Sequence, residues 1–177
     1  MQPSNPALKR VATLNLSLIP ICRRSRPQHK PGLPLWRDAD AIAPLFDAYR
    51  QFYEQPTNLP LATRFISDRL QNNESVILLA VSEDQQFMGF CQLYPSFCSV
   101  EAMPIYSLYD LFVQPEARRY RAGKALLQGA ERHAARNVFC TIGLTTVKTN
   151  ASALSLYESL GWVRDDIFYE YSKHIKD

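Results

Sequence analysis

One stretch of the chain, residues 113–127, limits the choice of fold and function more than any other. It leads from the end of an apolar, strand-like segment through a turn at Pro115 into a basic loop, and then into the pattern of an amphipathic helix. The cations of the loop are Arg118, Arg119, Arg121 and Lys124. A helix that starts at such a junction points unpaired backbone N–H groups and the positive end of its dipole outward, which favours phosphate binding. The stretch therefore predicts a strand–loop–helix unit that holds a phosphorylated cofactor.

The loop alone is equally compatible with a solvated basic turn before a surface helix, because basic turns are common. The chain contains neither the GxGxxG pattern of Rossmann folds nor the P-loop pattern GxxxxGK followed by Ser or Thr. We therefore do not expect nucleotide binding of either kind.

Composition indicates one globular domain. The chain has 177 residues, of which 46% are hydrophobic and 21% are charged, as in compact domains. The net charge of +3 is too small to favour a nucleic-acid partner. No apolar run is as long as a membrane span, so we expect no membrane partner.

The cysteines indicate a reducing compartment. Cys22, Cys91, Cys98 and Cys140 show no CxxC spacing and have no histidines at zinc-ligand intervals. We expect free thiols, no metal site and a cytoplasmic protein. Cys91 and Cys140 fall in apolar strand-like runs, where a thiol is usually buried.

The order of elements predicts the fold class. Residues 1–34 are rich in Pro, Arg, Ser and Gln, so they predict a poorly ordered extension or a peripheral strand before a domain over 35–177. Expected helices cover 39–53, 60–71, 122–136 and 151–160; expected strands cover 75–81, 87–94, 105–113, 138–147 and 167–174, with a hairpin turn at 83–85 and a short extra piece at 96–100. This order predicts a single α/β domain with a mixed, mostly antiparallel central sheet and helices on both faces.

A second motif lies at residues 150–162. Asn150 is placed to cap a helix that Gly161 ends. Ala153, Leu156, Tyr157 and Leu160 recur with helical spacing, which turns them toward the interior. Tyr157 is therefore either a core aromatic residue or, if a thiolate leaving group lies near it, a general acid.

Together, the strand that ends in Leu-Phe-Val, the basic turn and the pattern Asn-Ala-x-Ala-x-x-Leu-Tyr-x-x-x-Gly-Trp resemble the GNAT superfamily of acetyl-CoA-dependent N-acetyltransferases. The resemblance covers residues 35–174. The phosphate loop of that family reads Q/R-x-x-G-x-G/A. Here Arg118 and Gly123 match, whereas Arg121 replaces the first glycine. Its side chain either weakens cofactor binding or contacts phosphate directly.

The resemblance implies a set of cofactor contacts. The pyrophosphate of acetyl-CoA would lie over residues 119–124, which include Ala122 and Gly123. The backbone of Phe112 and Val113 would pair with the pantetheine arm, and Asn150 would contact that arm. Tyr157 would protonate the departing coenzyme A thiolate.

Asp110, in the strand before the loop, is the first candidate for the base that removes a proton from the amine, through water. It is also compatible with a buried carboxylate that only fixes the strand. Some polyamine-acetylating relatives carry a glutamate at the place of Tyr109, and this chain does not. Acceptor pockets in such folds are built by segments that correspond here to residues 49–61 and 94–106, which contain many aromatic residues.

The expected function is direct transfer of an acetyl group from acetyl-CoA to a primary amine of a small molecule or peptide. Two alternatives stay open: a non-catalytic acyl-CoA sensor with the same fold, and a protein or peptide acetyltransferase. A homodimer is also left open.

Overall fold

The computed structural model describes residues 15–19, 39–82 and 85–175. These residues form two compact parts, one that ends at Thr145 and one that begins at Thr146, and each is described by itself.

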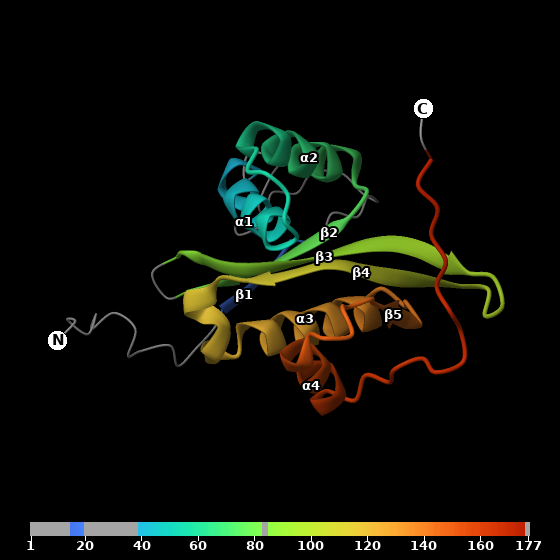
Figure 1. Ribbon diagram of the computed structural model, residues 1–177. Helices are drawn as coiled ribbons and strands as arrows, with labels where there is room; N and C mark the ends of the chain where they lie inside the picture. The colour runs from blue at the N-terminus through green and yellow to red at the C-terminus, as the bar shows by residue number, and fades with distance from the viewer. Residues whose placement is uncertain (1–14, 20–38, 83–84, 176–177) are drawn as a thin grey trace. The chain divides into compact units, whose positions relative to one another are not determined.

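The first part is built on a five-stranded mixed sheet (Figure 1). Its strands are β1 (Asn15–Ile19), β2 (Val76–Val81), β3 (Phe87–Cys98), β4 (Met103–Val113) and β5 (Thr141–Gly143). They lie in sequence order, and each pair up to β3–β4 is antiparallel, whereas β5 runs parallel to β4. β1 is an edge strand, one of the two possibilities that the sequence left open for the N-terminal residues.

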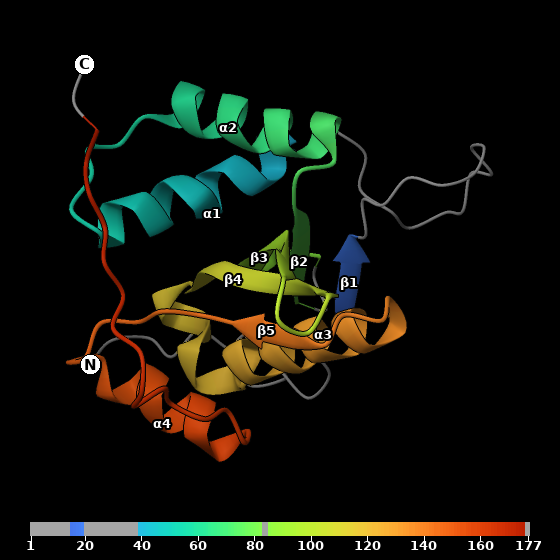
Figure 2. The same ribbon diagram turned by 90° about the vertical axis from the view of Figure 1, so that its right-hand side faces the viewer.

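Helices cover both faces of this sheet. α1 (Ala39–Phe52) and α2 (Leu59–Asn72) lie on one face, and α3 (Ala122–Arg136), which follows the short 3-10 helix η3 (Pro115–Tyr120), lies on the other (Figures 1 and 2). The predicted α/β class, with a mostly antiparallel mixed sheet and helices on both faces, is confirmed.

The main core lies between the α1–α2 pair and the sheet. It combines the apolar stripes of both helices with alternate residues of β2, β3 and β4, among them Ile42, Ile66, Ile77 and Phe90, which are fully buried. Each such side chain contributes about 1.5–3 kcal/mol through its removal from water. α2 starts one residue before the predicted position, because the Asn58 side chain caps it by accepting a hydrogen bond from the Leu61 N–H at 3.1 Å.

Gly89 holds the start of β3 close against the end of β4. A Cβ at this position would lie 2.5 Å from the carbonyl oxygen of Phe112 and 3.0 Å from Cα of Val113. Only glycine therefore fits where β4 leads into the basic loop.

An irregularity in the β3–β4 ladder sets the orientation of the middle of β4. Gln92 faces Asp110, but the next pair is Leu93 with Leu108, so Tyr109 is an extra residue in β4. β5 pairs with β4 only over Ile105–Ser107. In the described residues, β4 therefore has a strand neighbour on one side only from Leu108 to Val113.

Several predicted boundaries are wrong for local reasons. β3 runs without a break to Cys98, so the separate piece at 96–100 does not form. The strand expected over 138–147 shrinks to β5, because Val138 adopts a φ of 62° as α3 ends and the Phe139 N–H bonds back to the Ala134 carbonyl. Cys140 is consequently exposed rather than buried, whereas Cys91 is buried as predicted. Glu83 and Asp84 of the predicted turn lie outside the described residues.

The second part contains α4 (Ala151–Ser159). The Asn150 side chain caps it by accepting from the Ala153 N–H at 3.3 Å, and Gly161, with φ 84°, follows its end, as predicted. The closing strand predicted over 167–174 is wrong, because this segment is irregular. The alternating sequence pattern shows which residues could share a face of a strand. A strand, however, forms only against a partner strand, and the described residues of this part contain no strand.

Candidate active site

A pocket of about 810 Å³ lies in the first part, on the face of the sheet that carries α1 and α2. Its lining comes from both helices, from the residues that follow them, and from β3 and β4. The residues are Phe46, Tyr49, Arg50, Tyr53, Gln55, Phe65, Arg69, Glu74, Tyr94, Ser107, Tyr109 and Asp110. The prediction that the segments 49–61 and 94–106 contribute aromatic residues to one pocket agrees with Tyr49, Tyr53 and Tyr94 in this lining.

Asp110 is the buried acid of this pocket, with a residue exposure of 4%. Burial raises its pKa to about 6, and the neighbouring hydroxyl of Tyr49, which donates at 3.4 Å to the Tyr109 carbonyl, opposes this rise. Burial, followed by the neighbouring Asp110, raises the pKa of both Tyr49 and Tyr94, so these phenols stay neutral. The carboxyl can therefore change its charge close to neutral pH, as a proton acceptor must.

Gln92 lies beside Asp110 across the β3–β4 ladder and is fully buried. Its Nε2 donates a 2.6 Å hydrogen bond to the Ser75 hydroxyl, but its Oε1 has no hydrogen-bond partner among the described residues. A buried acceptor of this kind normally has a donor, often a water molecule.

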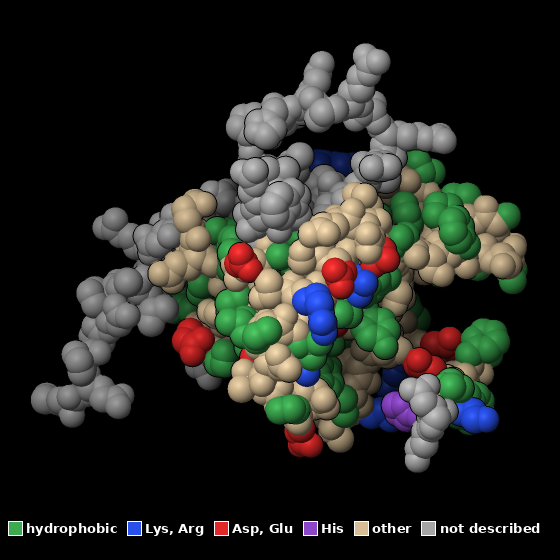
Figure 3. All heavy atoms as spheres, turned by 90° about the horizontal axis from the view of Figure 1, so that it is seen from above, with side chains coloured by type: hydrophobic (Ala, Val, Ile, Leu, Met, Phe, Trp, Pro, Cys, Tyr) green, Lys and Arg blue, Asp and Glu red, His purple; other side chains and the backbone are tan. Residues whose placement is uncertain are grey.

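The cations of the pocket have acidic partners. Arg50 Nη1 lies 3.3 Å from the Asp47 carboxylate, and Arg69 pairs with Glu74. Seen from the side of α1 and α2, acidic and basic side chains lie next to one another with hydrophobic side chains between them (Figure 3). The visible face thus carries mixed charge rather than charge of one sign.

Asp47 is a buried residue that the sequence reasoning missed. Its carboxylate accepts hydrogen bonds from the Thr57 hydroxyl at 2.6 Å, the Asn58 N–H at 2.9 Å and Gln51 Nε2 at 3.0 Å. These bonds tie α1 to the connection that leads into α2, and so hold the wall of the pocket around Tyr53 and Gln55. The turn-forming residues at 56–58 were the only sequence signal.

The predicted phosphate loop forms the junction between η3 and α3. Arg121 has φ 61° and ψ 15°, the left-handed conformation that favours glycine, at the place where the family pattern has glycine. Arg121, the N-cap residue of α3, makes no side-chain cap hydrogen bond, and the first turn of the helix lacks intrahelical partners for the N–H groups of Ala122, Gly123 and Lys124. Arg121 is exposed, Ala122 is buried, and Gly123 and Lys124 are half-buried.

The other predicted cofactor residues of the first part lie near this junction in the chain. Phe112 is buried in the main core, and Val113 is half-buried. Arg118 Nε donates to the Val113 carbonyl at 3.1 Å, and its guanidinium lies 5.9 Å from the Phe52 ring centre. Arg119 belongs to η3, but its side chain lies outside the described residues.

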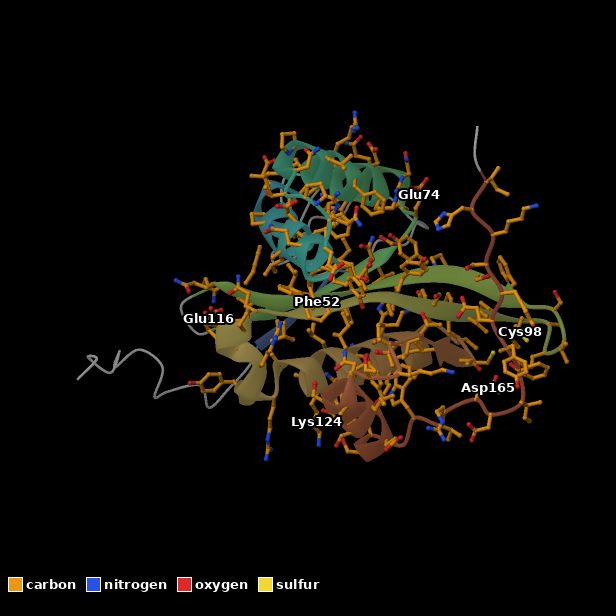
Figure 4. The ribbon with its side chains drawn as sticks, in the orientation of Figure 1. Phe52, Glu74, Cys98, Glu116, Lys124 and Asp165 are labelled. Atoms are coloured by element: carbon orange, nitrogen blue, oxygen red, sulfur yellow. The ribbon has the colours of Figure 1, made fainter. Side chains whose placement is uncertain are left out.

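The two candidate regions lie on opposite faces of the sheet. Figure 4 shows Glu74, which lines the pocket, on the side of the sheet that carries α1 and α2, and Lys124 of α3 on the other side. The stretch of β4 that lacks a β5 partner contains Asp110 and leads into the loop. An extended ligand could pair with this free strand edge and connect the two faces.

Asn150 and Tyr157 belong to the second part. Tyr157 is half-buried in α4, and its ring centre lies 6.0 Å from that of Trp162. Ala153, Leu156 and Leu160 are half-buried as well, as the predicted stripe requires.

No described helix has the length and apolar character that a membrane crossing requires. In the same residues, His, Cys, Asp and Glu form no cluster of three or more that would suit a metal ion.

The family, sequence and structure comparisons all find similarity to acetyltransferases. Residues 42–162 match the model of the acetyltransferase (GNAT) family. The chain is 47% identical over 138 residues to YhfO of Bacillus subtilis (strain 168), described as an uncharacterized N-acetyltransferase; the match covers 78% of this chain and 92% of that protein. The crystal structure of a probable acetyltransferase is 36% identical, has a TM-score of 0.76, and covers 81% of this chain and 96% of its own. The ribosomal-protein-alanine N-acetyltransferase of Brucella melitensis biovar Abortus 2308 shares the fold. Its structure is 20% identical, has a TM-score of 0.66, and the match covers 80% of this chain and 96% of that chain.

Proposed function

Because the chain belongs to the acetyltransferase (GNAT) family and is an acyltransferase, we propose that it moves an acetyl group from acetyl-CoA to a primary amine of a small molecule or peptide. The observation that carries this proposal is the position of Asp110. It is a buried acid in an aromatic pocket, and it lies on the part of β4 that pairs with β3 on one side and has no β5 partner on the other.

The residues of the first part fit a coenzyme A ligand. The uncapped first turn of α3 offers N–H groups to the pyrophosphate, and Arg121 and Lys124 add positive charge there. At the edge of β4 that has no β5 partner, the backbone of Val113 would pair with the pantetheine arm, whereas the Phe112 carbonyl faces Gly89 of β3 and is not available for this pairing. Arg118 would act mainly by fixing the end of β4, because its guanidinium is bonded to Val113.

When bound, acetyl-CoA supplies the acetyl group as a reactive thioester. The ionised Asp110 carboxylate would accept the proton that the ammonium group of the acceptor must lose before its nitrogen can attack. A water molecule would relay this proton, and the Oε1 of Gln92, which has no partner among the described residues and belongs to the residue opposite Asp110 in the ladder, could accept a hydrogen bond from it.

Tyr157 would donate its hydroxyl proton to the sulfur that leaves as the carbon–nitrogen bond forms and the carbon–sulfur bond breaks. Asn150 would contact the cofactor arm while its side-chain oxygen caps α4. Both roles rest on the match of residues 150–162 to the family pattern.

Two of the cysteines in the described residues, Cys91 and Cys140, support direct transfer over an acyl-enzyme. Burial raises the pKa of the Cys91 thiol well above its usual range. Cys140 bonds to the Glu101 carboxylate, which raises the pKa of that thiol as well. Neither is a ready thiolate nucleophile.

One observation favours a second candidate, a non-catalytic acyl-CoA sensor. Arg121 places a large side chain and a left-handed backbone where the family pattern has glycine. The two candidates separate in one experiment that measures acetyl-CoA binding by calorimetry and coenzyme A release with a panel of primary amines. An enzyme gives binding and amine-dependent release, whereas a sensor gives binding alone.

A further inference from the structure

The acceptor pocket contains one acidic group without a cationic partner among the described residues. Arg50 bonds to Asp47, and Arg69 pairs with Glu74. Asp110 forms no such ion pair among the described residues, and the group that affects its charge is the neutral phenol of Tyr49. The pocket therefore offers one carboxylate that a single positive charge on a ligand can neutralise.

Most of the remaining lining is aromatic. Phe46 and Phe65 stack with ring centres 5.0 Å apart, Tyr49 and Tyr53 meet edge to face at 5.1 Å, and Tyr94 and Tyr109 meet edge to face at 6.0 Å. Tyr53 and Tyr109 keep 47% and 73% of their surface exposed, so their rings are available to a ligand. Gln55 and Ser107 are the only neutral, non-aromatic polar residues that line the pocket in the described part of the chain.

We propose that the acceptor is a monoamine: one ammonium group on an aromatic or apolar body, without a carboxylate. This inference rests on the proposed function and specifies its substrate. The ammonium would lie at Asp110, and the apolar body would lie against the rings, which also attract a cation through their faces.

The same lining disfavours three other classes of amine. A polyamine carries further ammonium groups, which need further unpaired carboxylates. An amino acid carries a carboxylate, which needs an unpaired cation, whereas Arg50 and Arg69 have acidic partners. A peptide carries several backbone amides, and apart from the tyrosine hydroxyls only Gln55 and Ser107 offer neutral polar groups to them in this lining.

The test compares four probes that differ in these features: phenethylamine, phenylalanine, spermidine and an alanine-terminated tetrapeptide. Coenzyme A release is measured for each at saturating acetyl-CoA. We expect kcat/KM for phenethylamine to exceed the other values by at least about tenfold, because a group that the site cannot pair is strongly rejected. A higher kcat/KM for any of the other three would overturn the inference and leave the proposed function intact.

Binding of the same probes is measured by calorimetry in the presence of coenzyme A, so that the inference does not depend on turnover. If no probe is acetylated but phenethylamine binds at least tenfold more tightly than phenylalanine, the proposed function fails and the pocket assignment holds. Equal or reversed affinities would overturn the pocket assignment.

A variant locates the effect in the pocket. Tyr53→Ala should raise the KM for phenethylamine about two- to tenfold with little change in kcat, because it removes one ring contact. Tyr53→Phe should restore the wild-type KM. Phe97→Ala is the matched control, because Phe97 is 80% exposed and lies outside the lining. An unchanged KM in Tyr53→Ala, or an equal rise in the control, would contradict the assignment.

Discussion

The backbone N–H of Asn58 donates a 2.9 Å hydrogen bond to the buried carboxylate of Asp47, eleven residues earlier in the chain. Thr57, Gln51 and Arg50 donate to the same carboxylate. This one side chain thereby joins α1 to the start of α2 and holds one wall of the proposed acceptor pocket.

Asp47→Ala should lower the free energy of unfolding by about 1–3 kcal/mol, because it removes a buried, charged acceptor that several hydrogen bonds share. Urea denaturation measures this change. Asp68→Ala, on the exposed face of α2, is the control and should change stability by less than about 0.5 kcal/mol. Equal effects of the two substitutions would show that the Asp47 contacts contribute little.

Asp47 also predicts how stability depends on pH. The Thr57 hydroxyl, followed by the Asn58 N–H, lowers the pKa of this carboxyl below its usual value. Its contribution is therefore present above the pKa of the unfolded chain, about 3.9, and is lost as the pH falls through the lower pKa of the folded protein. Urea denaturation between pH 3 and 7 should show a smaller loss of stability with acid in Asp47→Asn than in the wild type. Parallel curves would contradict this prediction.

Gly89→Ala should destabilise the protein by about 1–3 kcal/mol, because the new methyl group meets the backbone of Phe112 rather than a side chain that can move. Gly143→Ala is a matched control, since nothing lies within 4 Å of a Cβ at that position and its φ is not positive. Thermal unfolding of the two variants should differ clearly, and equal melting temperatures would contradict the close approach of β3 and β4.

Much of this architecture is predictable because it depends on local signals. The bounds of α3 agree with the prediction at both ends, since a basic junction starts the helix and its apolar period continues without interruption. The segment after α3 was harder to foresee, because a β-branched residue, Val138, takes the left-handed position that glycine usually fills. The strand expected from residue 138 is shortened for that reason.

The chemistry of the site is less predictable. The sequence pointed to Asp110 as an acid before the loop, but its burial and raised pKa depend on α1 and on a register shift in the ladder at Tyr109. The contact of Asp47 with Thr57 and Asn58 has no periodic signature at all. The cytoplasmic location, the homodimer and the roles of the individual site residues stay predictions.

Arg121→Gly should raise the melting temperature, because it relieves a left-handed backbone that costs a non-glycine residue about 1–2 kcal/mol. If the Arg121 guanidinium holds phosphate, the same variant and Arg121→Ala should both bind coenzyme A at least about tenfold more weakly, while binding of pantetheine, which lacks the pyrophosphate, stays unchanged. Calorimetric titration with both ligands measures this. Tighter binding of coenzyme A by Arg121→Gly would show that the side chain obstructs the loop, and would favour the sensor.

Tyr157→Phe should keep the affinity for acetyl-CoA and lower kcat by about 10²–10⁴-fold, the usual contribution of a general acid. Tyr171→Phe, which removes the hydroxyl of a tyrosine that is 90% exposed in the same part of the chain, is the control. An unchanged kcat in Tyr157→Phe, with chemistry shown to limit the rate, would make Tyr157 a packing residue.

The central claim, that Asp110 accepts the proton of the acceptor amine, is tested most directly by the pH dependence of kcat/KM for the best amine, in the wild type, Tyr49→Phe and Asp110→Asn. In the wild type kcat/KM should rise with pH up to about 6, the pKa of Asp110, and then level off. Tyr49→Phe should move this break to higher pH, because it removes the neighbouring hydroxyl that lowers that pKa. Asp110→Asn should be about 10²–10⁴-fold slower near neutral pH and should keep rising toward the pKa of the free amine, about 10.4, because only the uncharged amine can then react. A wild-type rate with an unchanged break in Asp110→Asn would contradict the account.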